Sequence, residues 1–155
     1  MDEIDKEILD ILQHNGRITN TELAKKIGIS PPPTLERVRK LERNGIINGY
    51  VCLLNPEKVG IETFTFVGVI LARHGSEAVM KFIDAVNDVE EILDCYHVTG
   101  EADFLLKIAV RDIPAYEDLV LHTLTKLPGV QNLKTTVVLS TTKTETALPV
   151  ESEAA

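Results

Sequence analysis

Features typical of membrane, secreted and metal-binding proteins are scarce in this sequence of 155 residues. Its two cysteines, Cys52 and Cys95, fit neither a metal-ligand spacing nor a disulfide framework, which favours a reducing compartment. The longest strongly apolar run, Phe66 to Ala72, has the length of a strand, whereas a membrane-spanning helix needs about 20 residues. The acidic start, Met1 to Glu7, lacks the basic and apolar segments of a signal peptide. We therefore expect a cytoplasmic protein with no membrane partner.

Motifs of catalysis are scarce as well. The sequence has no Gly-rich phosphate loop, no paired-cysteine motif and no Gly-x-Ser-x-Gly turn. Acidic clusters such as the one from Asp88 to Glu91 are expected at helix ends or turns, as solvated faces. Four histidines are scattered along the chain, at His14, His74, His97 and His122. We predict no enzyme activity, no catalytic or metal-binding residues and no cofactor.

Charge is distributed unevenly, although the net charge of -8 argues at first against a nucleic-acid partner. Residues 1–55 are neutral overall, and the whole acidic excess lies in residues 56–155. Within the first part, residues 17–43 carry seven basic and three acidic side chains. Such asymmetry is a hint of a nucleic-acid-binding module joined to a second domain. The alternative is a solvated helix face.

Apolar periodicity in residues 1–54 predicts three helices and a strand hairpin. Thr19 with Glu22 fits a capping box, and Gly28 supplies a tight turn. Ser30 is a good N-cap for the third helix, and the three prolines after it fit the helix entry, where the backbone amides have no intrahelical acceptor. The helices are expected from Glu3 to His14, from Thr19 or Asn20 to Gly28, and from Ser30 to Asn44-Gly45, with a hairpin from Ile46 to Leu54 that turns at Asn48-Gly49.

The second and third of these helices form a helix-turn-helix pattern. In that motif the N-terminal end of the second helix enters the major groove of DNA. We expect Leu35, Val38 and Leu41 to face the core, and Thr34 and Arg37 to project outward and read bases. The complete set of expected DNA-binding residues, phosphate contacts included, is Arg17, Ser30, Pro32, Pro33, Thr34, Arg37, Arg39, Lys40 and Arg43. A three-helix bundle without nucleic acid is the alternative.

Residues 62–142 change to a pattern of strands and helices in the order βαββαβ. A shift of 41 residues places Val67 and Val69 on Ile108 and Val110, which indicates an internal repeat. The expected fold is α+β, a (winged) helix-turn-helix domain of three helices followed by a ferredoxin-like domain whose two helices cover one face of an antiparallel sheet. A second subunit is expected to cover the other face of the sheet. The residues expected on that face include Phe64, Phe66, Leu93, Cys95, Leu105 and Val137.

Five segments carry a resemblance to a known family: Ile4–Leu9, Arg17–Ala24, Arg37–Ile47, Val98–Asp103 and Leu127–Val130. Together they resemble the Lrp/AsnC (feast/famine) family of prokaryotic transcription regulators, over about residues 2–143. The resemblance implies an N-terminal DNA-binding domain, a C-terminal domain that senses amino acids, homodimers, and often octamers built from four dimers. In this family the effector typically lies between dimers.

The effector site implied by the resemblance is the turn from Thr99 to Asp103. A zwitterionic amino acid needs amide donors for its carboxylate, and Gly100 lets the backbone approach a ligand closely. Glu101 or Asp103 would then take the ammonium. The expected effector-binding residues are Tyr96, Thr99, Gly100, Glu101, Ala102 and Asp103. The alternative is a hairpin turn whose residues serve turn geometry alone.

The expected organisation is a DNA-binding domain over residues 1–54, a linker over 55–61, an effector-binding and oligomerisation domain over 62–142, and a flexible tail over 143–155. The expected function is sequence-specific DNA binding by a transcription regulator that responds to a small molecule, an amino acid by resemblance. A metabolite-binding or assembly module without DNA binding is the alternative. The effector's identity, the target genes and the sign of regulation do not follow from the sequence.

Overall fold

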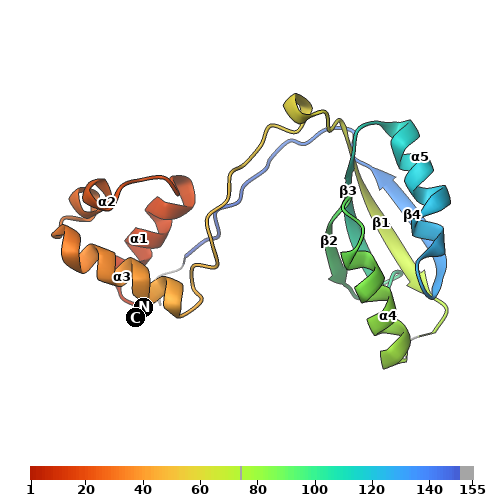
Figure 1. The fold of residues 1–155 in the computed structure, drawn as a ribbon, viewed down its shortest axis with the longest axis horizontal. Coiled ribbons are helices and arrows are strands. Elements are labelled where there is room, and N and C mark those ends of the chain that lie inside the picture. The colour runs from red at the N-terminus through yellow and green to blue at the C-terminus, as the bar shows by residue number, and fades with distance from the viewer. Residues whose placement is uncertain (74, 151–155) are drawn as a thin grey trace. The chain divides into compact units, whose positions relative to one another are not determined.

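The computed structural model describes residues 1–73 and 75–150, so His74 and the last five residues of the expected tail lie outside the described residues. The chain divides into two compact units (Figure 1). The first, here called the helical unit, comprises Met1–Leu53 and Lys143–Ala155. The second, the sheet unit, comprises Leu54–Thr142.

The helical unit contains the three expected helices, α1 (Glu3–His14), α2 (Asn20–Ile27) and α3 (Pro31–Arg43). Thr19 and Glu22 form the predicted capping box at the start of α2, and Gly28 ends that helix with a left-handed φ of 74°. One small core joins the three helices, and its buried members are Ile8, Leu9, Leu23 and Leu41.

The buried stripe of α3 differs from the expected one. Thr34 is completely buried and its Oγ1 donates to the Ser30 carbonyl at 3.0 Å, whereas Leu35 is exposed. On a helix of 3.6 residues per turn, Thr34 lies about 20° around the axis from Leu41, and Leu35 lies about 120° away. The expectation that Thr34 projects outward was therefore wrong, as was the core position given to Leu35.

The hairpin expected from Ile46 to Leu54 is not formed, since this segment contains no strand. It is held to the helices by Tyr50, whose hydroxyl donates to Glu42 Oε1 at 3.0 Å. Burial, followed by the bond to Glu42, raises the pKa of Tyr50 to about 12. A short 3-10 turn, η1 (Glu57–Val59), follows in the sheet unit.

The C-terminal segment differs from a free tail. Residues 147–150 lie against α1, where the Gln13 side-chain amide donates to the Leu148 carbonyl at 3.1 Å and accepts from the Leu148 amide at 2.6 Å. Val150 packs on the core of the helical unit. The prediction that the chain frays from residue 143 is therefore wrong for residues 147–150.

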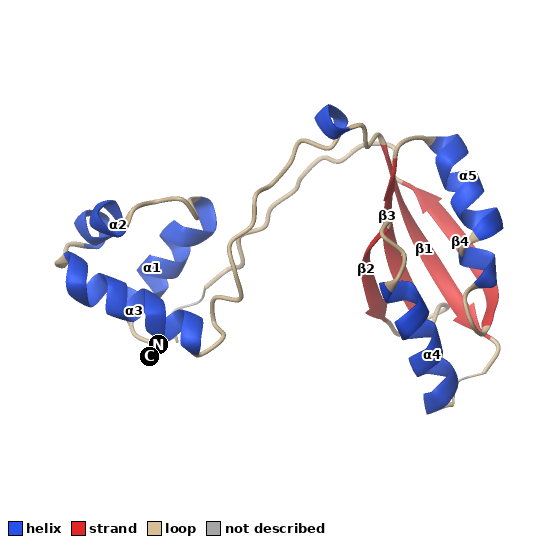
Figure 2. Ribbon diagram, in the orientation of Figure 1, coloured by secondary structure: helices blue, strands red, loops and turns tan. Residues whose placement is uncertain are grey.

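The sheet unit has the predicted βαββαβ order. Its strands are β1 (Thr63–Leu71), β2 (Ile92–His97), β3 (Phe104–Val110) and β4 (Val130–Val137), and its helices are α4 (Ser76–Asn87), α5 (Ile113–His122) and the short η2 (Leu124–Lys126). The strands form one antiparallel sheet in the order β2-β3-β1-β4, with α4 and α5 on the same side of it (Figures 1 and 2).

Alternation along β1 separates the two faces of this sheet. Its odd-numbered residues, such as Val67 and Val69, are buried beneath α4 and α5 together with Phe82 and Leu119. Its even-numbered residues are half-buried and face away from the helices. Strand pairing places further residues on this second face, here called the open face, whose members include Phe64, Phe66, Gly68, Ile70, Asp94, Tyr96, Leu105, Lys107 and Lys134. Cys95 and Val137, expected there, pair instead on the helix side.

Candidate DNA interface and effector turn

The N-terminal tip of α3 is exposed and carries no side-chain cap. Ser30 is the N-cap residue, but its hydroxyl accepts no bond from the helix. An N-cap side chain binds the amide of the second or third helical residue, and here those residues are Pro32 and Pro33, which have no N–H. Ser30 therefore presents a hydroxyl at the exposed tip, and Asn20 fixes that tip by donating to the Pro31 carbonyl at 2.8 Å.

Arg37, expected to read bases, is bound within the helical unit. Its Nη1 lies 2.7 Å from Asp2 Oδ2 and 2.7 Å from Asp5 Oδ1, at the start of α1. The bonds to Asp2 and then to Asp5 raise the pKa of the guanidinium. The backbone amide of Asp5, followed by Arg37, lowers the pKa of Asp2. These contacts tie α3 to α1, while about a third of the Arg37 side chain stays exposed.

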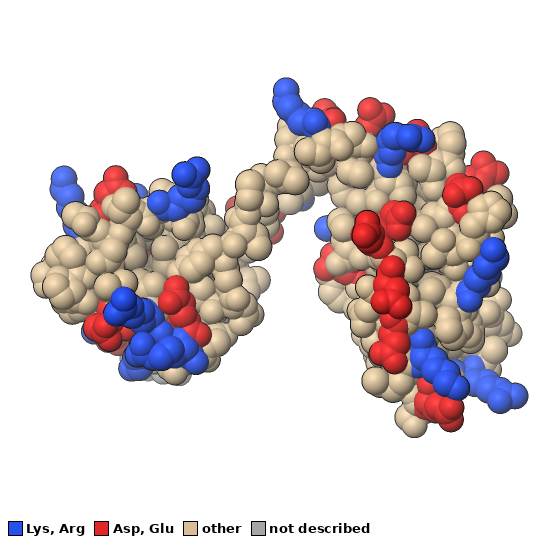
Figure 3. Space-filling model, in the orientation of Figure 1, with Lys and Arg blue, Asp and Glu red and all other residues tan. Residues whose placement is uncertain are grey.

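The other basic residues expected at DNA are exposed. Within the described ranges, Arg17, Lys40 and Arg43 form no ion pair, and Arg39 pairs only with Glu36 at 3.2 Å, one turn away. Figure 3 shows basic side chains clustered on the helical unit beside a few acidic ones, and a column of acidic side chains on the sheet unit. The unpaired cations therefore keep their charge available for an external anion.

The expected effector turn connects β2 to β3, and Gly100 in this turn has a φ of 116°. The amides of Gly100, Glu101 and Ala102 are bonded to no acceptor in the part of the chain that the structure describes. A row of free amides in such a turn is a donor set for a carboxylate. The positive φ favours glycine at this position.

The two carboxylates of the turn have different surroundings. Asp103 Oδ2 accepts from the Leu71 amide at 2.8 Å, and the Asp103 amide donates to the Val69 carbonyl at 2.9 Å. Asp103 therefore anchors the turn to β1, and this anchoring is a structural reason for an aspartate at position 103. Glu101 is exposed and pairs with Lys134 of β4 at 3.1 Å.

Two more features shape the surface around this turn. Tyr96 is exposed and pairs with Leu105 across the open face, where the charge of neighbouring Asp94 is the main cause that raises its pKa. Gly68 of β1 lies beneath the turn, since a Cβ built on it would stand 3.3 Å from Ala102 Cβ. The absence of a side chain at residue 68 thus lets the turn lie close to the sheet.

Several residues that organise these sites were not predicted from the sequence. Asp2 and Asp5 have a local signal, because a carboxylate three residues after another at a helix start fits a reciprocal cap, which the structure contains. No local signal marks Gln13, Gly68 or Lys134, because their partners are distant in sequence. These contacts depend on strand register or on the path of the C-terminal segment.

Two sequence families match the chain in these same regions. Residues 1–48 match the winged helix-turn-helix DNA-binding domain, and residues 65–148 match the Lrp/AsnC ligand binding domain. The second match alone covers more than half of the chain. The protein belongs to the Lrp/AsnC family. The resemblance stated from the sequence is thereby confirmed, and so is the combination of a helix-turn-helix domain with a ferredoxin-like domain.

Relatives of known name are similar over almost the entire length. The chain is 44% identical to the leucine-responsive regulatory proteins of Klebsiella pneumoniae and of Escherichia coli K12, over 98% of this chain and 93% of theirs. A crystal structure of a transcriptional regulator from Neisseria meningitidis in complex with L-Met superimposes with a TM-score of 0.93 at 39% identity, over 97% of both chains. AsnC of E. coli gives a TM-score of 0.87 at 27% identity, over 94% of this chain and 97% of that one.

This Lrp/AsnC protein is a DNA-binding transcription regulator with a ligand-binding domain, and its relatives are regulators, not enzymes. The expected function is confirmed over the alternative without DNA binding. None of the helices in residues 1–73 and 75–150 is long and apolar enough to cross a membrane.

Proposed function

We propose that the protein binds DNA through the exposed tip of α3, with the surrounding cations on the phosphates. The observation that carries this proposal is the arrangement of Arg17, Lys40 and Arg43, all exposed and without an ion-pair partner among the described residues. Arg39 adds a fourth cation that is held only by a surface pair, which contributes little. The Ser30 hydroxyl and the apolar edges of Pro32 and Pro33 are the groups that the tip offers to bases.

A salt titration tests the phosphate contacts. Four contacts from each of two protomers make eight, so affinity should fall roughly ten-thousand-fold between about 50 and 200 mM salt. Arg43→Ala should reduce the slope of log K against log salt by about 1.8 per dimer. Lys126→Ala, an exposed cation of the sheet unit, is the matched control and should leave the slope unchanged. The measurement is a gel shift with the duplex upstream of the protein's own gene.

Arg37 stays in the proposed interface because part of its side chain is exposed beside the tip. If it reads a base, Arg37→Ala should weaken binding of the specific duplex about ten- to hundred-fold and blur sequence preference. An equal loss on random DNA would assign Arg37 to holding α3 against α1 instead. Thr34 is left out of the proposed readers because it is buried and bonded to Ser30.

The proposed effector is an amino acid held at the turn from Thr99 to Asp103. Support comes from the free amides at Gly100 to Ala102 and from the relatives, which include leucine-responsive proteins and a regulator solved with L-Met. The amides would bind the effector carboxylate. Glu101 would release Lys134 and bind the ammonium group of the effector instead. Calorimetry with a panel of amino acids tests this, with Glu101→Gln expected to weaken binding and no heat from any of them contradicting it.

The proposed assembly is a homodimer formed through the open face, with octamers of four dimers as the higher state, in the cytoplasm. Support comes from Phe64, Phe66, Ile70 and Leu105, which lie together on the open face where no helix of the sheet unit covers them. Phe66→Lys should shift the sedimentation coefficient to that of a monomer. Sedimentation with and without the amino-acid panel reports whether an effector shifts the balance between dimer and octamer. Unchanged dimers in the Phe66→Lys variant would contradict the assignment of the open face.

A further inference from the structure

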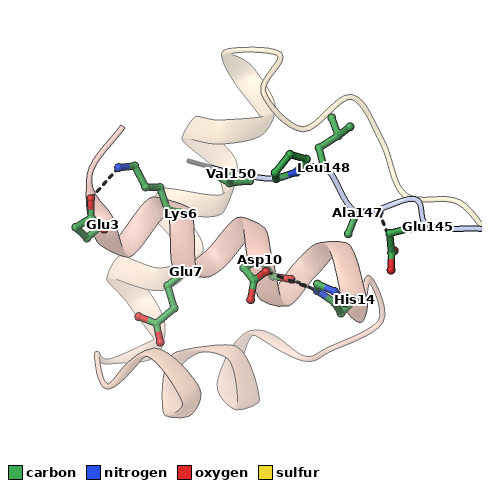
Figure 4. Close-up of a pocket in the computed structure, with 10 residues that line it drawn as sticks. Glu3, Lys6, Glu7, Asp10, His14, Glu145, Ala147, Leu148 and Val150 are labelled. Carbon is green, nitrogen blue, oxygen red and sulfur yellow. Dashed lines mark hydrogen bonds and ion pairs between the residues drawn. The ribbon is translucent and has the colours of Figure 1, made fainter. Parts of the chain in front are cut away.

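An extended piece of the chain's own C-terminus lies against the helical unit and borders a groove there. The groove is lined by apolar side chains of α1 and of the segment after α3, namely Leu9, Leu12, Ile46, Ile47 and Tyr50. Residues 147–150, here called the strap, run beside α1 (Figure 4), and Leu148 to Val150 form one wall of the groove. The strap therefore covers apolar surface that the three helices leave open.

Recognition of the strap is directed at its backbone. The Gln13 amide forms a reciprocal pair with the Leu148 N–H and carbonyl, as a neighbouring strand would. The Leu148 side chain is 74% exposed, so it adds little burial. Val150 supplies the apolar contact with the helical core. Just before the strap, the Glu145 carboxylate accepts hydrogen bonds from the backbone amides of Thr146 and Ala147 and so fixes the local path of the chain.

The strap is continuous with the effector-binding part of the chain. It follows β4 through residues 138–146, which contain no helix or strand. Lys134 of β4 is the ion-pair partner of Glu101 in the effector turn. The chain thus connects the effector turn to α1 by a route separate from the segment after α3.

We propose that the groove beside α1 is a docking site for an extended peptide, that its occupant is the strap, and that this docking transmits effector occupancy to the DNA-binding unit. The transmission part rests on the proposed function of the turn. The docking part does not, because it follows from the contacts of Gln13 and Val150. Docking couples the units only while the strap stays bound, so its release should separate effector binding from DNA binding.

Two substitutions at one position separate the backbone contact from the side chain. Leu148→Pro removes the N–H that donates to Gln13, and Leu148→Ala keeps it while losing the same side chain. Gln13→Ala removes the partner from the other side. Leu148→Pro and Gln13→Ala should speed hydrogen exchange of α1 amides about ten-fold in the full-length protein, and Leu148→Ala should leave exchange nearly unchanged.

The second measurement is the ratio of DNA affinities with and without L-leucine or L-methionine, on the duplex upstream of the protein's own gene. Leu148→Pro should bring this ratio close to one while basal DNA binding persists, and Leu148→Ala should keep the parental ratio. Equal exchange in the two Leu148 variants would overturn the docking, and a parental ratio in Leu148→Pro would overturn the transmission. A parent that responds to no amino acid would refute the proposed effector instead, and the exchange measurement would still decide the docking.

Discussion

The contact between Gly68 and the effector turn yields a prediction whose magnitude follows from the structure. A Cβ at residue 68 would stand 3.3 Å from Ala102 Cβ, whereas carbon atoms in good contact lie about 3.5 to 4.0 Å apart. Overpacking of this kind costs about 1 to 3 kcal/mol. Replacing a strand glycine by alanine returns about 0.5 to 1 kcal/mol of backbone entropy. Gly68→Ala should therefore lower the free energy of unfolding of the sheet unit by about 1 kcal/mol.

A compensating substitution isolates the contact itself. Ala102→Gly removes the methyl group that Gly68→Ala would meet, so in that background Gly68→Ala should be neutral or stabilising. The coupling energy between the two positions should be about 1 to 2 kcal/mol, well above the roughly 0.3 to 0.5 kcal/mol within which independent substitutions add. Gly68→Ala alone should also weaken amino-acid binding, because it lifts the turn from β1.

Urea denaturation followed by circular dichroism, together with calorimetric amino-acid titration, measures both effects. A loss of about 1 kcal/mol should lower the melting temperature of a unit of this size by about 4 to 8 °C. Additive effects of the two substitutions, or a stabilising effect of Gly68→Ala alone, would refute the reasoning from this close approach. Gly49→Ala serves as a control, because a Cβ there meets no atom within 4 Å.

Two further predictions concern the caps of the helical unit. Thr19→Ala should lower the free energy of unfolding by about 1 kcal/mol, and Ser30→Ala should change it by less than about 0.5 kcal/mol, because the Ser30 hydroxyl binds no helix amide; equal losses in urea titrations would contradict this. The backbone amide of Asp5, then Arg37, lowers the pKa of Asp2 in the folded state, so the stability that Asp2 provides is present above its unfolded pKa and lost as pH falls through the folded pKa. Asp2→Ala should flatten the acid limb of the stability curve, and parallel limbs in parent and variant would argue against that linkage.

Local signals account for much of what the sequence predicted. The capping box at Thr19, the left-handed glycine at residue 28 and the apolar periodicity of α1 each operate within a few residues, so they are legible without tertiary structure. The internal repeat with a shift of 41 residues supported the predicted βαββαβ order of the elements along the chain. The N-cap predicted at Ser30 forms no side-chain bond, because the prolines at the second and third helical positions have no amide to donate.

The errors at the candidate DNA interface arose where packing against other helices decides orientation. Thr34 is buried because it shares the face of Leu41, while Arg37 at the edge of that face reaches Asp2 and Asp5. At the effector turn, the ligand contact expected of Asp103 stays a prediction, and the close passage of β1 adds the Leu71 amide as a partner that the sequence did not reveal. A turn read alone does not reveal which strand lies beneath it.

By itself the sequence determined the helices, the order of helices and strands along the chain, the split of charge between the two halves and the family. Caps, periodicity and short motifs are properties of neighbouring residues. Only the tertiary structure decided that Gln13 binds Leu148 across a separation of 135 residues, that Lys134 meets Glu101, and that Gly68 makes room for Ala102. Each of these contacts depends on the register of the sheet or on the return path of the chain. Those features depend on how the apolar surface of the whole chain is buried, and no single segment carries a local signal of that burial.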